Sequence, residues 1–298
     1  MAASWFGGSV GSLAGSSPVA GFGLEFSTFE SNTMSDYHAI KALSNSALTC
    51  LKQSPEVFRD RYILGKPQAE SDAFKIGSAV HCMVLEPHLF SDRYAAAPRV
   101  DKRTKQGKAD WEAFQSAVGG RELLTEEEHA EIVATAQAFG KHAGLATLLG
   151  SYGRIIEEPI NFELFGEQFK AKPDCVIPSA KVIIDIKTTQ SVKPRKFAWS
   201  AIDYGYHRQA AIYMHACEEK YQEPFRFLFA CVEKKYPFEV AVFELDGRSV
   251  SDGMDQVEKL VDEYKRRIEQ NDWLPNHSKG IVSLQLPRVE HFRYEESE

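Results

Sequence analysis

Charged residues inside a strand-like segment constrain the fold of this chain most strongly. Residues 172–189 read KPDCVIPSAKVIIDIKTT, and alternation along a strand puts Asp185 and Lys187 on one face. If residues 178–181 form a tight turn, the hairpin pairs Asp174 with Asp185, with side chains about 5 Å apart. Two carboxylates at that separation raise each other's pKa unless a cation lies between them. The segment therefore predicts a β-hairpin that holds a divalent metal ion.

Two aspartates and a lysine in this arrangement suit metal-assisted hydrolysis of a phosphodiester. Carboxylate oxygens hold magnesium, which polarises the phosphate and acidifies a bound water. Lys187 would place a positive charge near the attacking water or the phosphate. A surface hairpin with an Asp–Lys ion pair is the alternative, because short motifs also match by chance.

The remaining pattern predicts one α/β domain over residues 34–298, with a mainly helical part (34–150) and a sheet-containing catalytic core (151–298). Ser44 can cap a first helix and Pro55 can begin a second. A nearly all-apolar helix at residues 71–87 carries His81, which by itself would be read as a core histidine with one hydrogen bond. Strand patterns follow at residues 153–187 and 226–245, a long helical stretch lies at 197–221, and an amphipathic helix at 252–270.

Composition limits the class of protein. The 298 residues carry a formal net charge of −7, which disfavours nucleic-acid binding by the molecule as a whole but not by a local groove. Basic residues cluster in RVDKRTKQGK and KPRK. No run approaches the roughly 18 apolar residues of a membrane helix, so we expect no membrane association. Residues 1–33 are rich in Gly and Ser and lack Lys and Arg, which predicts a disordered extension.

Four motifs together carry a family resemblance. PD followed by DIK across a hairpin is similar to the PD-(D/E)xK nuclease superfamily. GSAVHCMVLEP, KPDCVIP, DIKTT and YGYHRQAAIYM occur in the order seen in RecE-like exonucleases, the exonuclease VIII family of phages and prophages. The likeness extends over about residues 37–286. It implies a restriction-endonuclease-like core, in which a mixed central β-sheet is flanked by helices, with an N-terminal helical region.

The resemblance also implies residue roles. The metal ligands it implies are His81, Asp174, Asp185 and the Ile186 carbonyl. Lys187 resembles the catalytic lysine, while Gln209 and Tyr213 resemble the QxxxY signature and share one helix face. Tyr206 falls on the same stripe. We expect ordinary core packing to account for Trp199 and Ile212, and Glu157 or Glu158 could add a further acid to the site.

Family members of this kind degrade linear double-stranded DNA processively from 5′ ends and leave 3′ single strands for recombination by a RecT-like annealing protein. The expected cofactor is Mg²⁺, with Mn²⁺ also suited to the ligand set. Some members form homo-oligomeric rings. We expect DNA contacts at Arg103, Lys105, Lys193 and Arg195, with Trp111 as a possible wedge at the duplex end.

Three alternatives stay open. An endonuclease could use the same core, and a catalytically silent protein could bind DNA ends. Iron–sulfur nucleases share the core but need a flanking cysteine cluster. The five cysteines are scattered and never spaced CxxC, which disfavours that cluster, a zinc site or a disulfide framework, and is typical of a reducing cytoplasm.

Overall fold

The computed structural model describes residues 41–66, 72–281 and 283–284. The predicted disordered extension at residues 1–33 lies outside the described residues. Within these ranges, no helix combines the length and the apolar composition needed to cross a membrane.

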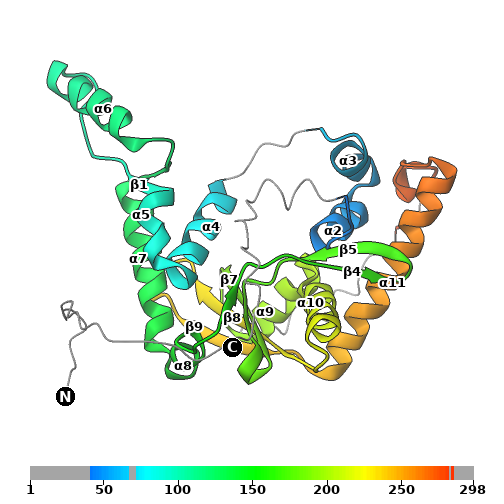
Figure 1. Cartoon of the computed structure of the whole chain (residues 1–298). Coiled ribbons are helices and arrows are strands. Elements are labelled where there is room, and N and C mark those ends of the chain that lie inside the picture. The colour runs from blue at the N-terminus through cyan, green and yellow to red at the C-terminus, as the bar shows by residue number, and fades with distance from the viewer. Residues whose placement is uncertain (1–40, 67–71, 282, 285–298) are drawn as a thin grey trace, which may run out of the picture. The chain divides into compact units, whose positions relative to one another are not determined.

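A five-stranded mixed sheet lies at the centre of the fold (Figure 1), which confirms the predicted fold class. Its strand order is β3-β6-β7-β8-β9. The strands are β3 (Ile155–Ile156), β6 (Cys175–Ile177), β7 (Val182–Thr189), β8 (Arg226–Glu233) and β9 (Val240–Glu244). β7 and β8 run parallel, and the other neighbours run antiparallel. The central strand β7 is therefore hydrogen-bonded on both sides and buried along most of its length.

The hairpin of β6 and β7 has the predicted register. The turn is a short 3₁₀ segment, η3 (Pro178–Ala180), followed by Lys181 with φ 54°. Val176 pairs with Ile183, which aligns Asp174 toward Asp185 one step beyond the end of β6. A slip of one residue would move every side chain to the opposite face, so this register fixes the face on which Asp185 and Lys187 lie.

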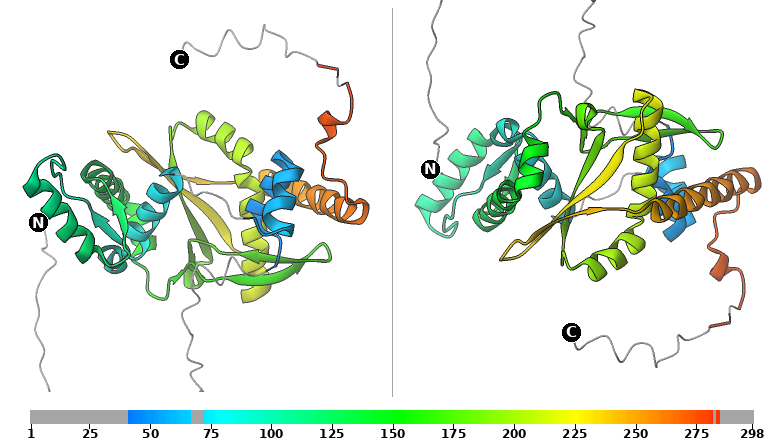
Figure 2. Two further views of the ribbon diagram at one scale, coloured as in Figure 1. Left: turned by 90° about the horizontal axis from the view of Figure 1, so that it is seen from above. Right: turned by 90° about the horizontal axis from the view of Figure 1, so that it is seen from below.

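Helices cover both faces of the sheet (Figure 2). The face of Ile183 packs against α2 (Asn45–Gln53), α9 (Pro194–Tyr204), α10 (Tyr206–Tyr221) and α11 (Gly247–Gln270). The face of Ile184 and Ile186 packs against α4 (Asp72–Leu85), α7 (Glu126–Lys141) and α8 (Ala143–Leu149). Two apolar clusters thus enclose β7, and each polar side chain on this strand must find a partner inside the protein.

The smaller elements surround this core. Between residues 55 and 124 these are α3 (Pro55–Phe58), η1 (Arg59–Ile63), η2 (Pro87–Leu89), α5 (Phe90–Arg93), β1 (Tyr94–Ala96), α6 (Lys105–Val118) and β2 (Glu122–Leu124). Later in the chain these are the antiparallel pair β4 (Ile160–Leu164) and β5 (Glu167–Ala171), and η4 (Asn276–Ser278). β1 and β2 form a two-stranded parallel sheet within the part that was predicted to be mainly helical.

Local signals explain several helix boundaries. The Ser44 side chain accepts a hydrogen bond from the Ala47 amide and begins α2, and Pro55 occupies the first turn of α3, both as predicted. The stretch predicted as one helix at residues 197–221 is two helices, separated at Gly205. Gly205 has φ 69°, and a Cβ there would lie 2.0 Å from the Arg208 guanidinium. Glycine avoids both the strain of this positive φ and the contact with Arg208.

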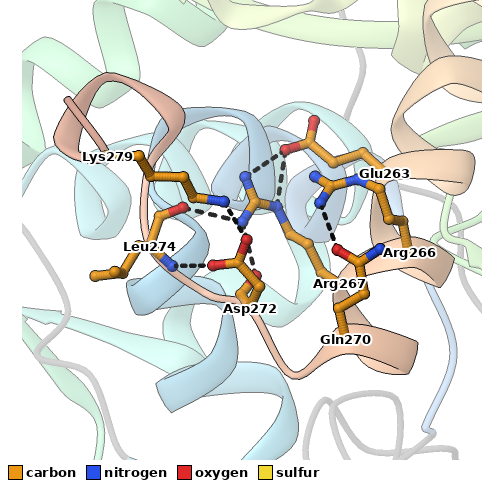
Figure 3. A network of polar contacts seen from close by, with 7 residues as sticks. All are labelled: Glu263, Arg266, Arg267, Gln270, Asp272, Leu274 and Lys279. Carbon is orange, nitrogen blue, oxygen red and sulfur yellow. Dashed lines mark hydrogen bonds and ion pairs between the residues drawn. The ribbon is translucent and has the colours of Figure 1, made fainter. Parts of the chain in front are cut away.

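A buried arginine holds the chain that follows α11 (Figure 3). Arg267 is 1% exposed and donates hydrogen bonds to Glu263 Oε1 at 2.8 Å and to the carbonyls of Asp272 and Leu274 at 2.8 and 3.1 Å. The segment it holds carries Trp273, whose ring stacks on Phe58 at 5.9 Å. The guanidinium therefore satisfies two carbonyls beyond the end of α11. It also holds the segment whose Trp273 packs against α3.

Close contact between α10 and α11 depends on Gly253. A Cβ at this position would lie 2.4 Å from the His207 carbonyl oxygen. We expect Gly253→Ala to lower the free energy of unfolding by about 1–3 kcal/mol, because the helices must separate. Gly247→Ala is the control in the same helix, since a Cβ there meets nothing within 4 Å. Urea denaturation of both variants checks this, and equal stabilities would contradict it.

Candidate active site

Asp185 and Lys187 form an ion pair on β7 beneath α10. The Asp185 side chain is fully buried, and the Lys187 ammonium lies 2.6 Å from its Oδ2. Gln209 donates to Asp185 Oδ1 at 2.9 Å. The Tyr206 ring lies under the same ammonium, with its centroid 4.7 Å from Nζ. Two residues of α10, three positions apart, thus contact the two charged groups of β7.

Asp174 and His81 lie next to Ile186 of β7, and they come from the start of β6 and from α4. Asp174, directly before β6, accepts a hydrogen bond from the Ile186 amide at 2.7 Å. His81 of α4 places Nδ1 3.5 Å from Asp174 Oδ2 and Nε2 3.0 Å from the Ile186 carbonyl oxygen. A carbonyl only accepts, so in the neutral ring Nε2 carries the proton and Nδ1 keeps its lone pair. The residues predicted as ligands therefore meet around Ile186.

Burial dominates the electrostatics of the ion pair. Burial raises the pKa of Asp185 to about 6, against the lowering effect of Lys187. Burial also disfavours the charged form of Lys187, but the carboxylates of Asp185 and Asp174 outweigh it and raise the pKa of this ammonium. Lys187 is therefore protonated at neutral pH, which suits it to stabilise negative charge and not to act as a general base.

The donor set fits a hard divalent cation, but the side chains are not gathered around one. Among the residues that the structure describes, no group of three or more His, Cys, Asp or Glu side chains is arranged to hold a metal ion. Asp185 Oδ2 is turned to Lys187, and the ammonium lies 2.6 Å from this buried oxygen. A divalent cation bound here would share the Asp185 carboxylate with this ammonium or replace it.

The other predicted members of the site lie as follows. Tyr213, one turn beyond Gln209, packs its ring against Phe227, with centroids 6.2 Å apart. Glu157 and Glu158 form ion pairs with Lys172 at 2.5 Å and Lys220 at 2.6 Å. The structure thus gives both glutamates partners other than the ion pair of β7.

The predicted DNA contacts fall on two separate elements. Lys193 and Arg195 are exposed at the start of α9, just beyond the end of β7. Arg103 and Lys105 lie at the start of α6, which Figures 1 and 2 show beyond the β1–β2 sheet, away from the five-stranded sheet. In that region the Lys102 ammonium lies 3.2 Å from the centre of the Trp111 ring. Of the four predicted DNA contacts, the structure therefore brings only Lys193 and Arg195 near β7.

The expectation of core packing is right for Ile212 and wrong for Trp199. Ile212 is fully buried, but the Trp199 side chain is 60% exposed. Phe197 and Ala201 are the buried residues of α9, and Trp199, between them, lies on the opposite side of the helix. The sequence reasoning also missed the basic connection between β8 and β9, for which the adjacent lysines of KKYPF were the available signal.

Comparisons with known proteins identify a family and a similar fold. A model of the family described as a PDDEXK-like domain of unknown function (DUF3799) matches residues 44–286. The chain is similar to the crystal structure of a "Putative exonuclease" from Eubacterium rectale, with a TM-score of 0.58 and 13% identity over 92% of this chain and 100% of that one. A phage related exonuclease from Haemophilus somnus 129PT gives a TM-score of 0.33 and 14% identity over 75% and 94% of the two chains. No curated protein matches.

Stability should depend on pH through Asp185. Its pKa is raised in the folded state, so the folded protein holds a proton that the unfolded chain releases, and stability falls as pH rises from about 4 through 6. Relative to Asp185→Asn, the metal-free protein should lose about 2 kcal/mol of unfolding free energy between pH 4 and 7. Denaturant titrations with EDTA measure this difference, and a constant difference across pH would contradict it.

Proposed function

Because the chain belongs to this PDDEXK-like family, we propose that it is a metal-dependent nuclease that hydrolyses phosphodiester bonds of DNA. The observation that carries the proposal is the buried pair of Asp185 and Lys187 beside Asp174 and His81. Burying an ion pair in a central strand brings little stability by itself, since desolvation offsets the attraction. A reaction that uses both charges explains their place.

The ligands of the metal would be Asp174, Asp185, the Ile186 carbonyl and His81. Three of the four supply oxygen, which suits Mg²⁺ and also Mn²⁺. A bound ion would polarise the phosphate and acidify a water. It would also compensate the charge of Asp185, which Lys187 compensates in the metal-free protein.

Lys187 is the basic residue to which we assign a catalytic role. Its raised pKa keeps the ammonium charged, and its side chain is 16% exposed. The Tyr206 ring contacts this ammonium, and Gln209 fixes the Asp185 carboxylate. We assign positioning roles to Tyr206 and Gln209, because each contacts Lys187 or Asp185 and would act on the substrate only through those side chains.

The finer proposal is an exodeoxyribonuclease that degrades linear double-stranded DNA from 5′ to 3′ and leaves 3′ single strands for recombination. The motif order typical of RecE-like enzymes supports it. The similarity in fold to the Eubacterium rectale structure, which bears the name of an exonuclease, is consistent with it. A RecT-like annealing partner and a homo-oligomeric ring belong to the same proposal. An endonuclease or a silent DNA-end binder is the second candidate.

The cysteines favour a nuclease core without an iron–sulfur cluster. Cys82, Cys175, Cys217 and Cys231 are buried free thiols, and Cys50 is half-buried. Burial raises the pKa of Cys175, beside the catalytic aspartate, to about 11, so this thiol is protonated at neutral pH. Within the described ranges they gather into no ligand cluster, and a purified protein without visible colour would agree.

Degradation of end-labelled linear duplex DNA, compared with a covalently closed circle, tests the proposal. We expect loss of the linear DNA only with Mg²⁺, and at least about a hundredfold lower rates for Lys187→Ala and Asp185→Ala. Lys181→Ala is the matched control, because Lys181 lies in the same hairpin but pairs with Glu223 at the surface. Cutting of the circle would indicate an endonuclease, and DNA binding without any cleavage would indicate the silent binder.

The variant Gln209→Ala tests whether Gln209 positions the Asp185 carboxylate, because it changes no charge in the site. It removes the hydrogen bond to Asp185 Oδ1 but leaves all proposed ligands in place. We expect the Mg²⁺ concentration for half-maximal activity to rise about 10- to 100-fold. Gln270→Ala, which only loses a contact with Arg266 at the end of α11, is the control. An unchanged metal requirement would remove Gln209 from the site.

A further inference from the structure

The connection between β8 and β9 and the start of α9 form one exposed basic surface. We call it the strand-end surface and define it by its exposed members, Lys193, Arg195, Lys196, Lys234, Lys235 and Tyr236. Five of these six residues are basic, in a chain whose formal net charge is −7. Such a local reversal of sign is typical of a site for a polyanion.

Hydrogen bonds hold the two segments side by side at the end of β7. The Lys234 amide donates to the Thr189 carbonyl at 3.0 Å, and the Val192 amide donates to Glu233 Oε1 at 3.1 Å. Val192 is buried in one apolar cluster, and Phe238 packs against the other. Both segments are therefore anchored, and the lysines project from a fixed base.

The surface adjoins the candidate active site along the strand. Thr189, which accepts the Lys234 amide, lies two residues after Lys187 on β7, a rise of about 7 Å. This spacing is about that of one nucleotide in an extended strand. The acids of the same segments are Glu233, which is occupied with the Val192 amide, and the exposed Glu239. The basic charge therefore outweighs the acidic charge beside the site.

Tyr236 is the residue of this surface that can distinguish unpaired bases from paired ones. Its side chain is 87% exposed, between Lys235 and Pro237, so it contributes little to the core. An exposed aromatic ring among lysines can stack on a nucleic-acid base while the lysines contact phosphates. Paired bases inside a duplex keep their faces covered, whereas an unpaired base offers one.

We propose that the strand-end surface binds the unpaired nucleotides of a DNA strand adjacent to the scissile phosphate, with Tyr236 stacking on a base. The inference rests on the proposed function for the position of that phosphate. It adds a substrate feature, because a strand must separate from its complement by the time it reaches Tyr236. Lys193 and Arg195 then contact single-stranded and not duplex phosphates.

Fluorescence anisotropy with labelled oligothymidine of about 16 nucleotides, in EDTA, tests the inference on the full chain without cleavage. We expect Tyr236→Ala to weaken binding about 5- to 100-fold and Tyr236→Phe to restore it, because the ring is retained. The control is Tyr152→Ala, whose side chain is 99% exposed between α8 and β3. In Lys234→Ala/Lys235→Ala, the slope of log affinity against log salt should fall by about 1.4.

The outcomes distinguish the inference from the proposed function. Equal affinity of wild type and Tyr236→Ala, or an equal loss in Tyr152→Ala, overturns the inference even if the protein degrades DNA. Tyr236-dependent binding in a protein that never cleaves DNA supports single-strand binding by the strand-end surface and overturns the proposed nuclease. Tighter binding of blunt duplex than of oligothymidine, with no effect of Tyr236, would assign the lysines to duplex DNA and overturn the single-strand assignment.

Discussion

Asp185 carries a carboxylate in a place that water does not reach, and the surrounding structure is arranged to accommodate it. A buried charge is tolerated only with a partner and hydrogen bonds. Lys187, on the same strand, supplies the charge, and Gln209 supplies a hydrogen bond that depends on α10 lying over β7. The left-handed conformation of Gly205 ends α9 and starts α10 at Tyr206, so that Tyr206 and Gln209 face the strand.

The position of α10 is in turn fixed by contacts on its far side. Arg208, next to Gln209, is 1% exposed and donates to Thr49 of α2 at 3.0 Å and to Gln256 of α11 at 3.2 Å. Gly253 lets α11 approach the backbone of α10. The polar side of α10 thus serves the site while its other side is held by two helices. A rigid scaffold of this kind keeps catalytic groups in place without help from the substrate.

Much of this arrangement could be predicted, because a strand of period two determines which residues share a face. The alternation in β7 and the hairpin count gave the correct register, and β8 matches the predicted segment 226–233. The exposure of Trp199 could not be predicted, since apolar content does not tell which side of a short helix is covered. The ion pairs of Glu157 and Glu158 depend on lysines far along the chain, which spacing does not reveal.

The charge distribution separates catalysis from attraction of the substrate. Lys187 is compensated by Asp185 within the protein, so it adds little to the field outside. Exposed lysines at the end of β7 create that field, and the helix α6 carries a second basic cluster elsewhere. A protein of negative net charge can therefore attract a polyanion at one edge and repel it from other faces. In the proposed nuclease, the location of the exposed lysines, and not Lys187, would then determine from which side DNA approaches the site.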